Sequence, residues 1–123
     1  MNGGAFTIEV DRPRRALYVR VSGPLSDTVL AECRRATRLL PEFKEGFGTL
    51  LDLTGISTVN VSSAAIMFFG RAAQKDVNRF AILTDNITAS GFARIYEIIA
   101  DMGEHRVHVF NDEGEALEWI QSA

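Results

Sequence analysis

One stretch constrains the fold of this chain more than any other: residues 48–69, where a leucine-rich segment leads into two serines and an apolar run. The near-continuous leucines of residues 49–53 predict a strand that is buried on both faces, as in the centre of a parallel sheet. A polar loop, residues 54–63, follows, and either Ser62 or Ser63 then caps a helix. Since binding sites in open α/β sheets lie at such strand-to-helix junctions, the segment predicts both a sheet and a place for a site on it.

The rest of the chain alternates between strand and helix patterns, in the order β-β-α-β-α-β-α-β-α. Alternating strands and helices favour a parallel sheet with right-handed crossovers. Gly23 and Pro24 are expected to break the second strand, and Gly103 is expected to follow the end of the third helix. We therefore predict one α/β domain over residues 1–123, with a five-stranded, mixed, mostly parallel sheet, an antiparallel edge strand at residues 5–10 and about four helices.

Polar side chains that can accept hydrogen bonds from free N–H groups mark the helix starts. The first helix is expected to start at Ser26 or Asp27, and the third at Thr88 or Ser90. Asp112 and Glu115 have the spacing of a capping box at the last helix. The side chains expected to fill the core are Leu51, Leu53, Ile82, Phe92, Ile95, Ile99, Val107 and Val109.

Composition excludes several function classes. Thirteen basic and sixteen acidic residues among 123 give a formal charge of −3, which is no footprint for nucleic acid. The longest apolar run, residues 64–69, is too short to cross a bilayer, and residues 1–30 lack the pattern of a signal peptide. Cys33 is the single cysteine, has the spacing of a core residue, and fits a reducing compartment. We expect a cytoplasmic protein without a transmembrane segment.

Residues 64–69 are apolar around almost a full helical turn, whereas a surface helix should have a polar face. If Ile66 and Phe69 face the sheet, Met67 and Phe68 point away from it. An exposed pair of this kind is typical of a contact with a partner protein, a second copy or a lipid-like ligand. A flanking segment that covers the pair is an equally good interpretation.

The chemistry of catalysis is poorly represented. His105 and His108 flank the last strand without the spacing of metal ligands, and no nucleophile elbow is present. Asp52 lies within a strand and must be hydrogen-bonded if it is buried. A further set of polar side chains lies at the carboxyl end of the strand at residues 79–84. It could bind a small polar ligand or an anion, although turn and cap chemistry explains it equally well. Its members are Thr84, Asp85, Asn86, Thr88 and Ser90. We expect no enzyme activity, no metal and no cofactor.

Three segments resemble the STAS superfamily of anti-sigma factor antagonists, and within it the SpoIIAA-like group. Leu51-Asp-Leu-Thr-Gly-Ile-Ser-Thr-Val-Asn-Val-Ser-Ser63 is similar to the family's hydrophobic-Asp-Leu-Ser-Gly-Val segment that runs into Asp-Ser-Ser-Gly. Arg79-Phe-Ala-Ile-Leu-Thr-Asp85 resembles the strand before the third helix. Arg106-Val-His-Val-Phe110, followed by Glu115-Ala-Leu-Glu-Trp-Ile120, resembles the SpoIIAA-like ending. The resemblance covers nearly the whole chain. It implies the SpoIIAA-like fold and a regulatory, signalling function in a bacterial protein.

In anti-sigma antagonists, a serine after an aspartate is phosphorylated and switches partner binding. If Val61 is aligned with that aspartate, Ser62 aligns with the phosphorylated serine. If Asn60 is aligned with the aspartate instead, Val61 takes the serine position and Ser62 comes one residue later. Neither alignment restores the aspartate. Ser62 and Ser63 are therefore candidates both for helix capping and for a degenerate switch, in which an added charge would also meet the positive end of the helix.

Two functions follow from these patterns. The first is a regulatory module that docks a protein partner, such as an anti-sigma-like kinase, or a second copy. It would do so through the loop around Asn60, Val61, Ser62 and Ser63 and the helix after it. The second is a carrier or sensor of an apolar, lipid-like small molecule. Its pocket would be lined by Met67, Phe68, Phe92 and Tyr96.

Overall fold

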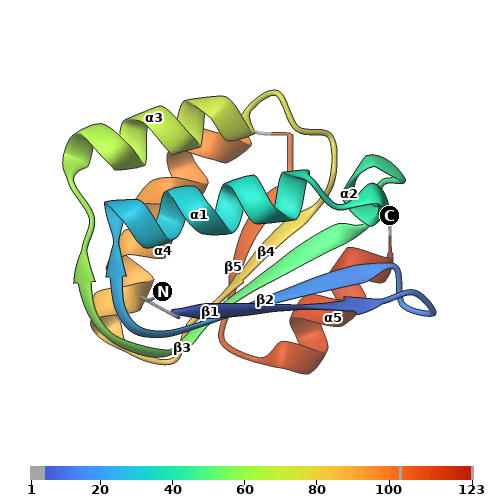
Figure 1. The fold of residues 1–123 in the computed structure, drawn as a ribbon, viewed down its shortest axis with the longest axis horizontal. Helices are drawn as coiled ribbons and strands as arrows, with labels where there is room; N and C mark the ends of the chain where they lie inside the picture. Colours follow the sequence, from blue (N-terminus) through green and yellow to red (C-terminus); the bar gives the residue numbers. More distant parts are fainter. Residues whose placement is uncertain (1–4, 103, 123) are drawn as a thin grey trace.

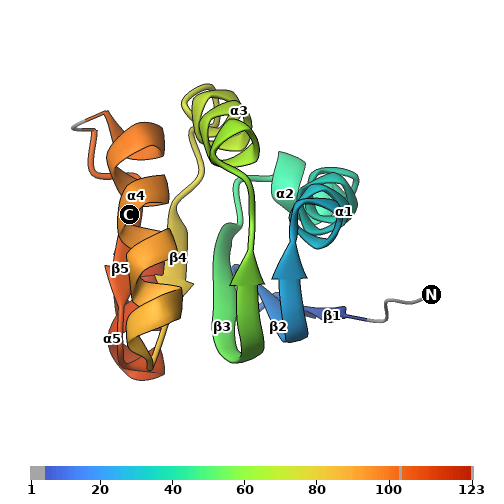
Figure 2. The ribbon, with the colours of Figure 1, turned by 90° about the vertical axis from the view of Figure 1, so that its left-hand side faces the viewer.

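The fold is a five-stranded sheet with helices on both faces, seen in a computed structural model that describes residues 5–102 and 104–122 (Figures 1 and 2). The strands lie in the order β1-β2-β3-β4-β5, with β1 antiparallel to β2 and every later pair parallel. The predicted fold class is confirmed. The strands are β1 (Phe6–Asp11), β2 (Ala16–Ser26), β3 (Gly48–Asn60), β4 (Phe80–Leu83) and β5 (Val107–Phe110).

Helices α1, α3 and α4 cover one face of the sheet, and α5 covers part of the other (Figure 2). Five helices occur among the described residues, one more than predicted, because Pro41 starts a short helix, α2. Proline is favoured at the first helical position, where its missing N–H would have no partner. The helices are α1 (Asp27–Arg38), α2 (Pro41–Lys44), α3 (Ser63–Ala73), α4 (Ile87–Asp101) and α5 (Glu113–Gln121).

Strands β2 and β3 are longer than the sequence predicts. Gly23 and Pro24 do not break β2, and the predicted loop at residues 54–63 is strand as far as Asn60. Gly23 has a φ of +75°, which glycine adopts at little cost, and the register shifts there and between Arg20 and Ser22. The strands therefore continue through the proline as a paired extension that ends at Ser26 opposite Asn60.

The core lies on both sides of β3, as the leucine pattern predicts. Leu51 and Leu53 pack beneath α1, α3 and α4, whereas Leu50 packs on the opposite face, beneath α5. Helices α3 and α4 approach closely at Gly70, where a Cβ atom would lie 2.5 Å from the Ile99 side chain. This close contact fixes the position of α3 above the sheet.

One of the predicted core residues is wrong. Ile95 is 49% exposed, whereas Ile99 is half-buried and the other six are buried. The face of α4 that meets the sheet holds Phe92 and Tyr96 with alanines between them, so the isoleucines fall to the side and outward. The expected cap at Gly103 lies outside the described residues. The C-cap of α4 is Met102, whose backbone is left-handed with a φ of 51°.

The central strand yields a stability prediction. The Leu53 side chain of β3 is fully buried beneath the helices α1, α3 and α4, so Leu53→Ala removes apolar contacts and leaves a cavity. We expect the variant to lose about 2–5 kcal/mol of unfolding free energy, measured by urea unfolding. A loss below about 1 kcal/mol would contradict the tight packing assigned to this strand.

Candidate functional site

The strand-to-helix junction predicted within residues 48–69 lies at the end of the paired extension of β2 and β3. There β2 leads into α1 and β3 leads into α3, and the two helices start side by side (Figures 1 and 2). Ser26 caps α1 by accepting a hydrogen bond from the Val29 N–H, and Ser62 caps α3 by accepting one from the Ala65 N–H at 3.1 Å. Because Ser26 and Asn60 are paired across the strands, the two helix starts are held next to each other. Of the two serines proposed as the cap of α3, Ser62 takes the role and Ser63 is the first helical residue.

Asp27 is the residue at this junction that sequence reasoning missed as a partner of Ser62. Its carboxylate accepts hydrogen bonds from the Ser62 N–H at 2.7 Å and from the Ser62 hydroxyl at 2.8 Å. The two residues are 35 positions apart, and only the long β2–β3 pairing brings them together. The contact ties the start of α1 to the start of α3, and we call it the Asp27–Ser62 latch.

The latch changes what a phosphate on Ser62 would meet. The hydroxyl hydrogen that now points to Asp27 would be replaced by about two negative charges. These charges would lie beside a carboxylate, and the repulsion opposes the attraction of the helix end that the sequence alone predicts. A phosphate on Ser62 would therefore replace the hydrogen bond to Asp27 with repulsion between negative charges.

Met67 and Phe68 lie on the side of α3 that faces away from the sheet. Phe68 is 68% exposed and Met67 is 38% exposed, whereas their neighbours Ile66 and Phe69 pack against the core. The Phe68 ring meets Phe69 edge to face at 5.1 Å between centroids. Near the start of the same helix, Asn60 is exposed, while Val61 is half-buried and packs on the core.

The polar side chains at the end of β4 and just after it make hydrogen bonds with one another and with the start of α4. Asn86, and not Thr88 or Ser90, caps α4, because its side-chain oxygen accepts the Ala89 N–H at 2.8 Å. The expectation of a cap at Thr88 or Ser90 is wrong, since both lie within the helix. Thr84 is buried, and its hydroxyl is 2.9 Å from that of Ser90. Asp85 accepts a hydrogen bond from Asn86 at 3.3 Å.

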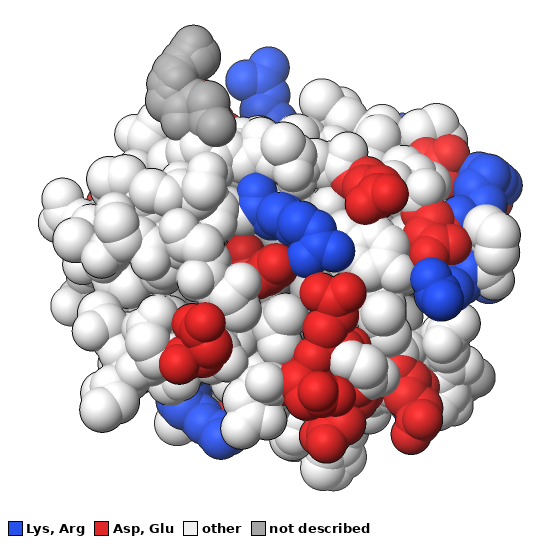
Figure 3. All heavy atoms as spheres, turned by 90° about the horizontal axis from the view of Figure 1, so that it is seen from below, with Lys and Arg blue, Asp and Glu red and all other residues white. Residues whose placement is uncertain are grey.

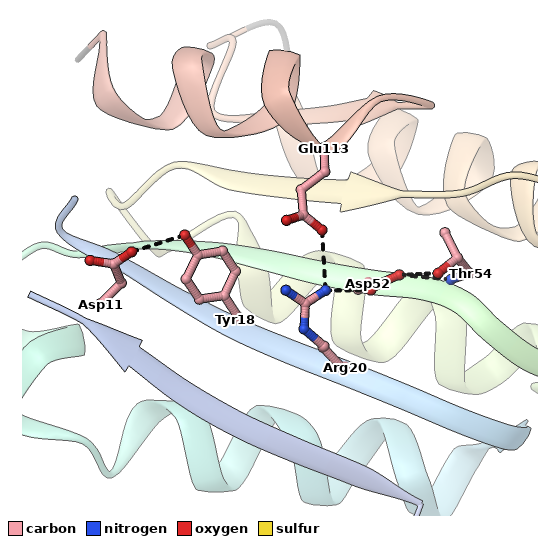
Figure 4. Close-up of polar contacts among 6 residues, drawn as sticks. All are labelled: Asp11, Tyr18, Arg20, Asp52, Thr54 and Glu113. Atoms are coloured by element: carbon pink, nitrogen blue, oxygen red, sulfur yellow. Dashed lines mark hydrogen bonds and ion pairs between the residues drawn. The ribbon is translucent and has the colours of Figure 1, made fainter.

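A second polar network, not foreseen as a unit, lies on the face of the sheet that carries α5 (Figure 4). One guanidinium nitrogen of Arg20 lies 2.7 Å from Asp52 and 3.2 Å from Glu113. The other oxygen of Asp52 accepts two hydrogen bonds, from the Thr54 N–H and hydroxyl. Acidic side chains gather on this side of the molecule (Figure 3).

Asp52 is hydrogen-bonded, as its position within a strand requires. Burial alone raises the pKa of the Asp52 carboxyl, but the Thr54 hydrogen bonds and the Arg20 charge outweigh it and lower the pKa below its ordinary value. Both oxygens of the ionised carboxylate therefore have partners. Arg20 also lies over the Tyr18 ring, and the Tyr18 hydroxyl donates to Asp11 at 3.1 Å. Burial raises the pKa of Tyr18. The network holds β2, β3 and α5 together.

Cys33 and His108 carry two further side chains of reactive types. Burial raises the pKa of the Cys33 thiol to about 12, so the nucleophilic thiolate is scarce at neutral pH. His108 is exposed and lies 3.1 Å from Glu97. Within residues 5–102 and 104–122, no three His, Cys, Asp or Glu side chains are placed to hold a metal ion.

The four side chains predicted to line an apolar pocket do not surround one cavity. A cavity of about 60 Å³ lies between α1 and the sheet, and Tyr96 lines it, whereas Met67, Phe68 and Phe92 do not. Phe92 instead packs in the core beside Tyr96, with ring centroids 6.0 Å apart. The carrier hypothesis, in its predicted form, is not supported by this geometry.

Comparisons with known proteins agree with the fold. A family model described as SpoIIAA-like matches residues 16–121. A crystal structure of an uncharacterized DUF3478-family protein with a SpoIIAA-like fold, from Shewanella loihica PV-4, is similar at a TM-score of 0.58 and 21% identity, over 94% of this chain and 92% of that one. No curated protein matches significantly. None of the described helices has the length and apolar character needed to span a membrane.

The lowered pKa of Asp52 predicts how stability depends on pH. A carboxylate with a depressed folded-state pKa adds stability above its unfolded pKa of about 4 and loses it as pH falls through the folded value. We expect Asp52→Asn to be less stable than the parent at neutral pH, and the difference to shrink below about pH 4. Urea unfolding at a series of pH values measures it, and a difference independent of pH would contradict the assignment.

Proposed function

The chain belongs to the SpoIIAA-like family, and we propose that it is a non-enzymatic regulatory domain that docks a protein partner through α3 and the residues that precede it. The observation that carries the proposal is the exposure of Phe68 and Met67 on a helix whose other side is anchored to the core. Large apolar side chains grouped on a surface are typical of interaction sites. Helix α4, which packs against α3, also exposes Ile95 and Ile98.

The charges around this apolar surface favour one kind of partner. Arg71 lies one turn after Phe68 on α3, Lys75 follows the helix, and all three side chains are exposed. An apolar anchor beside cationic groups fits a partner groove that is apolar in the middle and acidic at its edge. We infer a protein partner of this description. An anti-sigma-like kinase is the candidate that the resemblance to anti-sigma factor antagonists implies, and a second copy is an outcome that the tests distinguish.

The polar groups near α3 support docking rather than catalysis. Ser62 serves as cap and latch, and Asn86 caps the next helix. These are positioning roles that leave the apolar side chains as the surface a partner would read. Opening of the Asp27–Ser62 latch by phosphorylation is the regulatory step that we propose, because it acts directly at the start of the docking helix.

Docking through α3 predicts a selective loss of binding. The double variant Met67→Glu with Phe68→Glu places two carboxylates on the docking surface, where neither side chain supports the core. We expect retained folding, shown by circular dichroism, and at least about a hundredfold weaker binding to the partner recovered by pull-down from the source organism. Binding is measured by calorimetry, and sedimentation reports whether a second copy is the occupant.

The matched control is Leu39→Glu with Val77→Glu, which changes two other exposed apolar residues by the same chemistry. This control should bind the partner as the parent does. If both double variants bind equally well, α3 is not the docking surface. If both lose binding equally, net charge and not the surface is responsible, and the proposal is also wrong.

The latch predicts that two destabilising substitutions at Ser62 differ in their effect on partner binding. Ser62→Ala removes the cap and costs about 1 kcal/mol of stability, but it adds no charge and should retain partner binding. Ser62→Asp places a carboxylate against Asp27, so we expect a lower melting temperature and weaker binding. Adding Asp27→Asn to Ser62→Asp removes the repulsion and should restore part of the stability. Equal affinity of both single variants would reduce Ser62 to a helix cap.

A further inference from the structure

The cavity of about 60 Å³ is a partly open, mostly apolar space at the opposite end of the sheet from the latch. Its lining includes Thr49, Phe80 and Val107, which pair with one another at the starts of β3, β4 and β5. Ser62, in contrast, follows the end of β3. The cavity is therefore separate from the surface proposed for protein docking. Its apolar interior is formed by Val19, Leu30, Leu51, Phe69, Ala73 and Tyr96.

One polar group in this lining lacks a partner. Thr49 is only 2% exposed, and its hydroxyl has no hydrogen-bond partner within residues 5–102 and 104–122. Thr37, another buried threonine of the same lining, donates its hydroxyl to the Cys33 carbonyl at 2.7 Å. A buried hydroxyl without a partner is costly, and such a group in a native protein calls for an explanation. A bound molecule that accepts a hydrogen bond from Thr49 supplies one.

The charged side chains of the lining indicate that the bound molecule carries a negative charge. Four arginines line the cavity against a single acid, Asp76. Arg34 lies 3.4 Å from Asp76, and Arg38 contacts the same carboxylate. Arg106 donates to the Gln74 carbonyl at 3.1 Å and to the exposed Glu104 at 2.8 Å, and Arg79 donates to the Trp119 carbonyl. The side chains of Arg34 and Arg106 are only 22% and 18% exposed, so the excess positive charge is partly shielded from water.

We propose that this cavity binds a small aliphatic carboxylate. The alkyl chain occupies the apolar interior, and the carboxylate lies at the starts of β3, β4 and β5. There it accepts a hydrogen bond from Thr49 and is attracted by Arg34 and Arg106. The size of the cavity limits the chain to a few carbon atoms, because about 60 Å³ is less than half of the roughly 150 Å³ of a cavity that holds a benzene molecule. The proposal does not depend on protein docking through α3.

The test is a titration of the full chain with butanoate, followed by amide chemical shifts in NMR spectra. Butanoate should shift residues around Thr49, Cys33 and Ala73, with a dissociation constant of about 1 mM, as expected for so small a ligand. Acetate has a methyl group in place of the propyl chain and butanamide lacks the charge, so each should bind at least about tenfold more weakly. Equal binding of acetate and butanoate, shifts confined to exposed arginines, or no shifts at all would overturn the proposal.

Two matched pairs of variants locate the contacts. Thr49→Val keeps the side-chain shape and removes the hydroxyl, so it should weaken butanoate binding about tenfold without lowering the melting temperature, whereas the exposed Thr28→Val should not. Arg34→Gln should weaken binding similarly and leave the contact of Arg38 with Asp76 in place, whereas Arg35→Gln, on the outer side of α1, should bind as the parent does. Unchanged binding by either Thr49→Val or Arg34→Gln would contradict the proposed contacts.

Discussion

The parallel pairing of β2 with β3 is the interaction on which the rest of this structure depends. It continues past a glycine with positive φ and a proline, through two register shifts, until Ser26 lies opposite Asn60. Each strand ends next to the serine that caps its helix, so one strand pairing fixes the starts of both α1 and α3. The Asp27–Ser62 latch follows from this geometry, because two helix starts held side by side bring a first-turn carboxylate to its neighbour's cap.

The sequence predicts what depends on local pattern and misses what depends on pairing. Alternation and helical spacing were enough for the mixed sheet with its antiparallel edge strand and for the buried leucines of β3, and they narrowed the cap of α3 to Ser62 or Ser63. The continuation of β2 through Pro24 was missed because the local breaking tendency is overcome by pairing with a distant strand. Asp27 carried no signal as a partner of Ser62. Ile95 was misplaced because small alanines, and not isoleucines, occupy the sheet side of α4.

The two faces of β3 differ in whether their buried polar side chain has hydrogen-bond partners. Toward α5, the Asp52 carboxylate is fully engaged by Arg20 and Thr54, and burial is offset by these partners, so this network stabilises the fold without offering a free group. Toward α1, the same strand begins with a buried hydroxyl that has no partner in the described part of the chain. Strand β3 therefore carries a satisfied polar residue on one face and an unsatisfied one on the other, only three positions apart.

Helix α1 connects the two ends of the molecule where binding is proposed. Its first turn holds Asp27 against Ser62, and its second half supplies Cys33, Arg34 and Arg38 to the cavity. Seven residues separate Asp27 from Arg34, or about 10 Å along the helix axis. Because both draw side chains from one helix, the proposed partner contact and the proposed carboxylate site share α1, with Asp27 serving the first and Arg34 the second.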